Sequence, residues 1–281
     1  MTPSSIVIAG GIPTSADLTA IAGIPLGLTD SSISTGPGVL VEEDFVRHLD
    51  ELATVAAEPI AEDGRRVEYR MLNGVRRRSD DHLAGLVLRY ELTAMVGHPI
   101  GREAAKTAGH VHVKPSGSKL GYPEVVEVLH GEAGFLIQDL ETDLGGPHSR
   151  RAWLVRARAG DRVIFPPELA HVTIDLGAGP LVFSDIIDRR AAGVYAPVAE
   201  ARGFAWYVGA DGELRANDRY AVVPGLEVCD AAEWSGSADG PLYPAFAADP
   251  ASFSWLSEPD RFPDVAPRVW NRVGDLLASD R

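Results

Sequence analysis

The feature that most constrains the fold is a series of short β-rich runs between about residues 65 and 220, separated by turns rich in Gly, Pro and Asp. Many short strands punctuated by turns are typical of a sandwich or a small barrel. The turn at 209–212 is expected to join two strands as a hairpin, because glycines flank its Ala-Asp core. The runs predicted to be strands are 86–92, 110–113, 125–129, 134–140, 152–157, 162–165, 171–176, 181–187 and 204–208.

The segments that flank these runs have different patterns. Residues 1–40, which include a short apolar run at 5–9, predict an irregular arm because they are rich in Gly, Pro, Ser and Thr. A helix is predicted over 42–57, since apolar residues recur there at helical spacing and acidic residues stand at its start. A second helix is predicted over 267–278, with Val269, Val273, Leu276 and Leu277 on one face.

These patterns predict a mainly β protein with one β-domain and an extension at each end. We expect an N-terminal arm and helix over 1–60, the β-domain over 61–220 and a C-terminal extension over 221–281. No internal repeat or long low-complexity tract interrupts this order.

The composition excludes several classes of function. The chain has 40 acidic and 26 basic residues and a formal net charge of −14, which disfavours binding to nucleic acid or to an anionic membrane surface. The single cysteine, Cys229, rules out an intrachain disulfide and a Cys-rich metal site, and it favours a cytoplasmic location. No apolar run reaches the roughly 18 residues of a membrane span, and no signal peptide is expected.

The pair His110 and His112 is the first sign of a metal site. On a strand, residues i and i+2 point to the same face about 6.6 Å apart, so two imidazoles can converge on one ion. Glu124 begins the next apolar run and could return beside them. His171 follows a Gly160 turn, a strand and a rigid Pro-Pro pair. Three histidines and one carboxylate with open positions suit Fe(II), Mn(II), Ni(II) or Zn(II). The alternative for His171 alone is a buried, hydrogen-bonded core histidine.

These motifs resemble those of the cupin superfamily, and within it the cupin-type, metal-dependent glucose-6-phosphate isomerases. The first motif reads His110-Val-His112, Glu124 and Gly131, and the second reads Gly160, Pro166 and His171. The isomerase signatures Thr-x-Gly-His-x-His and Pro-Pro-x-x-x-His are matched at 107–112 and 166–171. The similarity covers roughly residues 40–220, and it implies a jelly-roll β-barrel.

The resemblance also implies an activity and a set of site residues. It implies one divalent metal per chain, with Fe(II) as the first choice, held by His110, His112, Glu124 and His171. It implies interconversion of glucose 6-phosphate and fructose 6-phosphate by proton or hydride transfer between C1 and C2. Glu124 is then either a ligand that swings free as the base or a ligand only. The sugar phosphate is expected near Thr93, Thr107 and Gly109, with Tyr195 as a wall of the pocket.

Two points about the strand before Glu124 stay open. If the strand continues past His112, Lys114 points to the same face as the two histidines and is predicted to offset the net negative charge of the chain there. A solvated surface lysine is an equal interpretation. Strict alternation places Thr107 on the face opposite His110, and a bulge at Gly109 would reconcile them.

The sequence departs from the isomerase pattern near the expected sugar pocket. Val126 and Val194 replace a Tyr and a His, Asp175 replaces an Asn, and the loop 113–123 is longer than in the isomerases. The lost Tyr and the longer loop favour an alternative to the isomerase, namely another metal enzyme on the same scaffold (a dioxygenase, epimerase, dehydratase or cyclase). A non-enzymatic sugar-binding or storage protein is a further alternative. We expect a homodimer in which the arm or the tail crosses between barrels.

Overall fold

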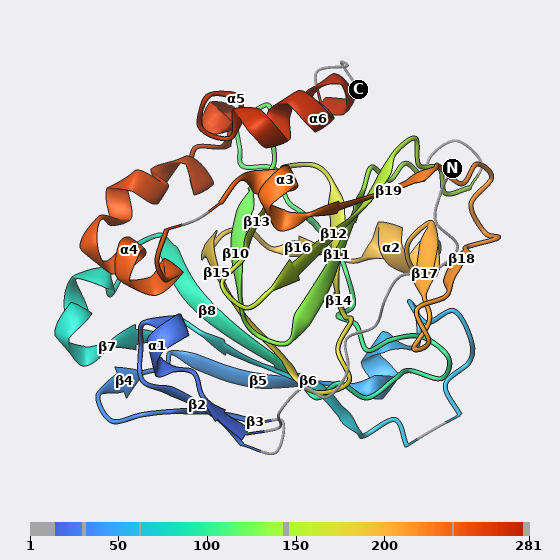
Figure 1. Cartoon of the computed structure of the whole chain (residues 1–281). Helices are drawn as coiled ribbons and strands as arrows, with labels where there is room; N and C mark the ends of the chain where they lie inside the picture. The colour runs from blue at the N-terminus through green and yellow to red at the C-terminus, as the bar shows by residue number, and fades with distance from the viewer. Residues whose placement is uncertain (1–14, 30–31, 62, 143–145, 238, 278–281) are drawn as a thin grey trace.

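Two facing β-sheets form the centre of the molecule (Figure 1). The computed structural model describes residues 15–29, 32–61, 63–142, 146–237 and 239–277. The six-stranded sheet has the order β13 (Arg162–Phe165), β10 (Glu124–His130), β15 (Leu181–Asp188), β8 (Leu88–Met95), β6 (Val67–Asn73) and β5 (Glu43–His48). The four-stranded sheet has the order β14 (Ala170–Asp175), β11 (Glu132–Gln138), β12 (Ala152–Arg158) and β19 (Leu226–Asp230).

The order of the strands is that of a jelly roll. The eight strands from β8 to β15 form the jelly roll. Strands β8, β15, β10 and β13, which are the first, eighth, third and sixth of the eight, lie side by side in one sheet. Strands β14, β11 and β12, which are the seventh, fourth and fifth, lie side by side in the other sheet. The second strand, β9 (Val111–His112), adjoins β14 through a bridge between His110 and His171. Two interleaved Greek keys produce this order. The prediction of a mainly β jelly roll is confirmed, with two sheets that stay separate among the described residues rather than closing into one hydrogen-bonded barrel.

The six-stranded sheet is covered on both faces. On β8, Tyr90, Leu92 and Ala94 belong to an apolar cluster on the outer face, whereas Glu91 and Thr93 face the space between the sheets. This division follows from the two-residue period of a strand. Every residue of β15 is buried, because both faces of the sheet are covered.

The outer face is covered by the first described residues and by part of the C-terminal extension. The N-terminal part forms a small sheet of β1 (Ser15–Asp17), β2 (Leu26–Thr29) and β3 (Ser32–Thr35), with the helix α1 (Thr19–Ala22), where an irregular arm was predicted. Its apolar residues pack with Tyr243 and Phe246 of α4 (Leu242–Ala248). The apolar run predicted at 5–9 lies outside the described residues.

The helix predicted over 42–57 is wrong. The structure has strand β5 there, followed by a short 3₁₀ helix η1 (Leu49–Leu52). Pairing of β5 with β6, from Glu43↔Asn73 to His48↔Val67, replaces helical hydrogen bonds, as tertiary context overrides local pattern.

The acidic residues predicted to begin that helix form ion pairs with arginines instead. Asp44 lies 2.6 Å from Arg70 across the β5–β6 pair, and Glu42 lies 2.8 Å from Arg76. Their charges therefore reinforce strand pairing rather than a helix terminus.

The C-terminal extension adds a strand and several helices. Strand β19 pairs with β12 in parallel, and α6 (Pro267–Leu277) confirms the predicted closing helix, with Val269, Val273 and Leu276 buried. The other helices here are α3 (Ala231–Ser235), η3 (Pro250–Leu256), η4 (Pro259–Arg261) and α5 (Phe262–Val265).

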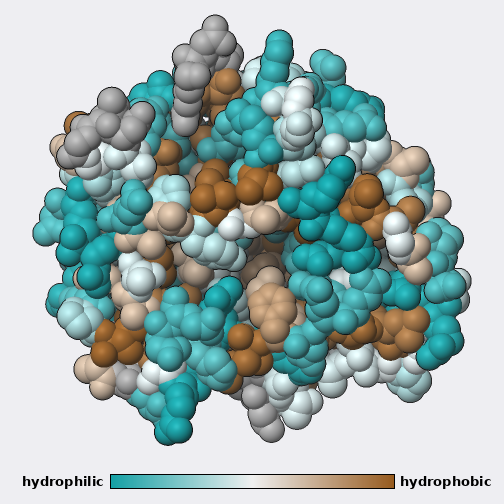
Figure 2. All heavy atoms as spheres, turned by 180° about the vertical axis from the view of Figure 1, so that it is seen from behind, coloured by the Kyte–Doolittle hydropathy of each residue, from teal (hydrophilic) through white to brown (hydrophobic). Residues whose placement is uncertain are grey.

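Short elements complete the fold. The predicted hairpin is confirmed as β17 (Trp206–Val208) and β18 (Leu214–Ala216), which pair antiparallel. The remaining elements are β4 (Val39–Leu40), β7 (Arg76–Arg77), η2 (Arg78–Leu83), β16 (Gly193–Val194) and α2 (Ala196–Glu200). In the part of the chain that the structure describes, no helix is long and apolar enough to cross a membrane. Seen from behind, the surface is mostly polar, with apolar residues in small separate groups (Figure 2).

Trp234 tests how strongly the extension stabilises the fold. It is fully buried against Trp153, with ring centroids 5.5 Å apart, and its Nε1–H donates to the carbonyl of Ile164 at 2.9 Å. Trp234→Ala is expected to lower the free energy of unfolding by about 3–5 kcal/mol in urea denaturation, because it leaves a large cavity. The control Val222→Ala, at a side chain that is 59% exposed, should change it by less than about 0.5 kcal/mol. A small loss for both variants would contradict this role of Trp234.

Candidate metal centre

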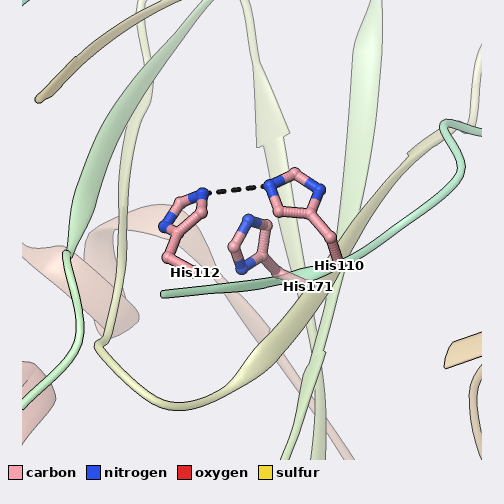
Figure 3. A group of neighbouring side chains, drawn as sticks. All are labelled: His110, His112 and His171. Carbon is pink, nitrogen blue, oxygen red and sulfur yellow. Dashed lines mark hydrogen bonds between the residues drawn. The ribbon is translucent and has the colours of Figure 1, made fainter. Parts of the chain in front are cut away.

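Three histidine side chains converge on one point between the sheets (Figure 3). His110 and His112 come from the segment around β9, and His171 comes from β14. The backbone N–H of His110 donates to the carbonyl of His171 at 3.1 Å, and the reverse bond is 2.9 Å long. This pairing fixes the two segments side by side. The ligand nitrogens of the three rings all lie within 4.8 Å of one another, and the Nε2 atoms of His110 and His112 are 2.9 Å apart.

The outer ring nitrogens are held by backbone carbonyls. Nδ1 of His112 lies 3.0 Å from the carbonyl of Tyr122, and Nδ1 of His171 lies 3.3 Å from that of Leu169. A proton on Nδ1 leaves Nε2 as the acceptor, which is how metal-binding histidines are commonly oriented. Nε2 of His171 is buried and has no hydrogen-bond partner among the described residues. An orphaned acceptor at the point of convergence fits a bound cation.

Glu124 lies beside this cluster at the first position of β10. Its Oε2 is 3.5 Å from Nε2 of His112 and 3.8 Å from Nε2 of His171. The structure therefore brings together all four residues expected as metal ligands.

Burial shapes the protonation of these groups. It lowers the pKa of His112 to about 4, and it holds the pKa of His110 and His171 well below the usual value, with the neighbouring imidazoles adding to the effect. Burial, followed by the nearby Glu91, raises the pKa of Glu124 to about 8. Neutral imidazoles are the form that binds metal. Three nitrogens and one carboxylate oxygen are a donor set that suits a divalent transition metal.

The cluster opens into a cavity of about 450 Å³ between the two sheets. Ligand sites are commonly cavities of this size. Of the residues expected to contact a sugar phosphate, four line this cavity together with the histidines and Glu124; they are Thr93, Thr107, Gly109 and Tyr195. The ring of Tyr195 lies 5.2 Å from that of His110 and is 43% exposed, which places it at the rim.

A backbone bulge explains how Thr107 and His110 reach the same cavity. Lys106 is bridged to Ile174 and His110 to His171, so three residues lie between the bridges on one segment and two on the other. The additional residue is the mark of a β-bulge, and Gly109 has the positive φ of +72° that such a kink favours. The bulge required by the sequence pattern is therefore present.

Lys114 matches the interpretation as a surface lysine rather than the one that places it in the pocket. Its ammonium lies 3.0 Å from Glu168, its side chain is 46% exposed, and it is absent from the residues that line the cavity. Strand β9 ends at His112, so the strand parity that predicted an inward side chain does not extend to position 114.

The positions that depart from the isomerase pattern have different surroundings. Val126 is fully buried in β10, and Val194 pairs with Val111. Asp175 lies outside the cavity lining and accepts the N–H of Gly177 at 2.8 Å, and burial raises its pKa to about 7. The long loop 113–123 supplies the Tyr122 carbonyl that orients His112.

The cavity also has a polar wall that the sequence analysis missed. Asn73, Arg89, Glu91 and Asp185 line it, all on the six-stranded sheet. Strand parity could have found Glu91, which stands two residues before Thr93 on β8 and faces the same way.

Gly109→Ala tests whether the bulge positions the ligands. A Cβ there would approach a ring carbon of Phe204 to 2.5 Å, in addition to the strain of a positive φ. We expect the variant to bind divalent metal at least tenfold more weakly, measured by titration calorimetry with Mn(II). The matched control is Gly117→Ala, whose φ is +83° but whose Cβ would meet nothing within 4 Å. Equal metal affinity in the two variants would contradict this role of Gly109.

Comparison with known proteins relates this site to a described family. The family model of glucose-6-phosphate isomerase (GPI) matches residues 46–224. The glucose-6-phosphate isomerase of Pyrococcus furiosus is 31% identical over 118 residues, which cover 42% of this chain and 55% of that protein. The isomerase of Thermococcus kodakarensis is 29% identical over 132 residues, which cover 47% of this chain and 62% of the relative. The chain thus spans about half the length of the curated relatives it matches.

Solved structures with some likeness include oxalate decarboxylase from Bacillus subtilis. That match has a TM-score of 0.29 and 20% sequence identity, and it covers 49% of this chain and 29% of the other. The fold assignment rests instead on the strand order described above. The family model covers well over half of the 281 residues, and the chain therefore belongs to the glucose-6-phosphate isomerase family.

Proposed function

We propose that this protein is a metal-dependent aldose–ketose isomerase that interconverts glucose 6-phosphate and fructose 6-phosphate. The observation that carries the proposal is the convergence of three neutral imidazoles and the Glu124 carboxylate in one cavity with Thr93, Thr107 and Gly109. Membership of the family supports the same substrate.

In this proposal, His110, His112 and His171 hold one divalent ion, with Fe(II) as the first choice and Mn(II), Ni(II) or Zn(II) as alternatives. Such an ion would polarise the substrate carbonyl and stabilise the negative charge that develops beside it. Glu124 is close enough to act on the same atoms. Its carboxylate takes a proton from one of the two carbons C1 and C2 and returns it to the other, while the hydroxyl proton passes between the oxygens on the same two carbons through water. A direct hydride shift would leave Glu124 as a ligand only.

The phosphate is proposed to bind in the same cavity, against residues that are not metal ligands. Hydroxyl groups of Thr93 and Thr107 and the backbone of Gly109 can hold it by hydrogen bonds. Arg89 and Arg189 line the same cavity and add positive charge there. Tyr195 at the rim would cover the bound sugar. Lys114 has no part in this site because it pairs with Glu168.

A second function is favoured by one observation. The acidic wall formed by Glu91 and Asp185 lies next to Val126, where the sequence departs from the isomerase pattern. A different metal enzyme on the same scaffold, such as an epimerase or a dioxygenase, would use that altered pocket. The homodimer, the cytoplasmic location and the boundaries at residues 60 and 220 stay predictions.

The direct test is to load the protein with Fe(II) or Mn(II) and to measure conversion of fructose 6-phosphate to glucose 6-phosphate in a coupled assay. We expect turnover that a chelator abolishes and that added metal restores. A protein with one metal per chain and no turnover on either sugar would refute the isomerase. Oxygen consumption in the same sample would point to the second function.

Two substitutions separate metal binding from proton transfer. His171→Ala is expected to lose the metal and all turnover, measured by elemental analysis and by the same assay. Glu124→Gln is expected to retain bound metal and to lower kcat by about 10²–10⁴-fold if Glu124 moves the proton. His98→Ala, at an exposed histidine outside the cavity, is the control and should change neither quantity. Full kcat in Glu124→Gln would favour the hydride shift.

A further inference from the structure

A row of polar side chains crosses the cavity wall on neighbouring strands of the six-stranded sheet. Asp185 of β15 pairs with Glu91 of β8, and on its other side with Val126 of β10. Leu72 pairs with Leu92, so the next residue of β6, Asn73, lies beside Glu91. Directly opposed residues have Cβ atoms about 4.5–5.5 Å apart. Asp185, Glu91 and Asn73 therefore form a continuous polar strip along one side of the cavity, which we call the acidic strip.

The acidic strip has hydrogen-bonding capacity that the described residues do not use. Asp185 is only 4% exposed and lines the cavity, and its side chain has no hydrogen bond or ion pair with any residue in the described ranges. Asn73 is also 4% exposed; its Nδ2 donates to Glu43 at 3.1 Å, which fixes the amide orientation and leaves Oδ1 without a donor among those residues. Buried polar atoms without hydrogen-bond partners are uncommon and costly. A ligand that supplies these partners would therefore bind more tightly.

The position of the strip relates it to the metal centre. Glu124 stands two residues before Val126 on β10, so Asp185 is its diagonal neighbour on the next strand, at about 7 Å. Thr93 stands two residues after Glu91 on β8, about 7 Å along the same face. A ligand that extends from Glu124 toward Thr93 passes over the acidic strip.

We propose that Asp185, with Asn73 and Glu91, forms a subsite that binds the hydroxyl groups of the substrate and determines specificity for a polyhydroxylated chain. The subsite rests on the proposed function in that it assigns these hydroxyls to the sugar phosphate held at the metal centre.

Hydroxyl groups match the strip better than a cation does. A hydroxyl both donates and accepts, so it can satisfy Oδ1 of Asn73 and either oxygen of Asp185. The guanidinium of Arg89 lies against Glu91 and also lines the cavity, so one positive charge is already in place there. Because that charge already pairs with Glu91, Asp185 is the acidic group of the strip that is left without a partner among the described residues, and a neutral hydroxyl can donate to it without adding a further charge to the cavity.

The test compares two six-carbon phosphates that cannot be isomerised. In sorbitol 6-phosphate, each carbon that does not carry the phosphate carries a hydroxyl group. Hexyl phosphate has the same chain length and no hydroxyl group on its carbons. Their affinities are measured by titration calorimetry on the metal-loaded protein. Asp185→Ala is expected to lower the affinity for sorbitol 6-phosphate by about 10- to 100-fold, the loss typical of removing a buried polar group. The affinity for hexyl phosphate should change by no more than about twofold.

Two further variants make the result interpretable. Asn73→Leu, which removes the amide at similar size, should give the same selective loss and serves if Asp185→Ala fails to fold. Ser184→Ala is the matched control because Ser184 is fully buried on the same strand and absent from the cavity lining. It should change neither affinity.

The outcomes separate the subsite from the isomerase. Selective loss in Asp185→Ala without any isomerisation by the wild type would support the subsite and refute the proposed function. The subsite alone would be overturned if the wild type isomerises the sugar phosphate and both Asp185→Ala and Asn73→Leu lose equal affinity, or no affinity, for sorbitol 6-phosphate and hexyl phosphate. Wild-type affinity for sorbitol 6-phosphate no higher than for hexyl phosphate would also overturn it.

Discussion

The pair of backbone hydrogen bonds between His110 and His171 is the contact on which the site depends. It joins the segment around β9 to β14, and thereby places residues that are 61 positions apart in the chain on one side of the cavity. The bulge at Gly109 turns the chain immediately before this pair. Without both features, the imidazoles and Thr107 would not face the same space.

The six-stranded sheet separates two environments. Its outer face is apolar and packs against the N-terminal sheet and α4, whereas its inner face carries Thr93, Glu91 and Asp185. Burial of those acidic groups is costly, and in Glu124, Glu91 and Asp185 it raises the pKa. Strongly perturbed carboxyl groups gathered in a cavity are common at functional sites.

The sequence predicted the parts of the structure that local pattern determines. Strand runs such as 162–165 and the helix ending at Leu277 follow from periodicity, and the His-x-His spacing predicted the metal centre. The helix over 42–57 was wrong because pairing with a strand about 25 residues away decides the conformation of β5. Lys114 lies outside the pocket because β9 stops at His112, and the acidic strip was missed because it depends on the register between strands.

The covering of the outer face affects the order in which the chain can fold. The hydroxyl of Tyr243 accepts the N–H of Arg77 at 2.7 Å, a contact between residues 166 positions apart, and its ring packs against Tyr90 at 5.1 Å. Contacts this distant in sequence form late, because closing so long a loop costs entropy before any packing repays it. During synthesis, α4 emerges only after the whole central sheet. Part of the apolar face of β8 therefore stays open to solvent, and to other nascent chains, until most of the protein has left the ribosome.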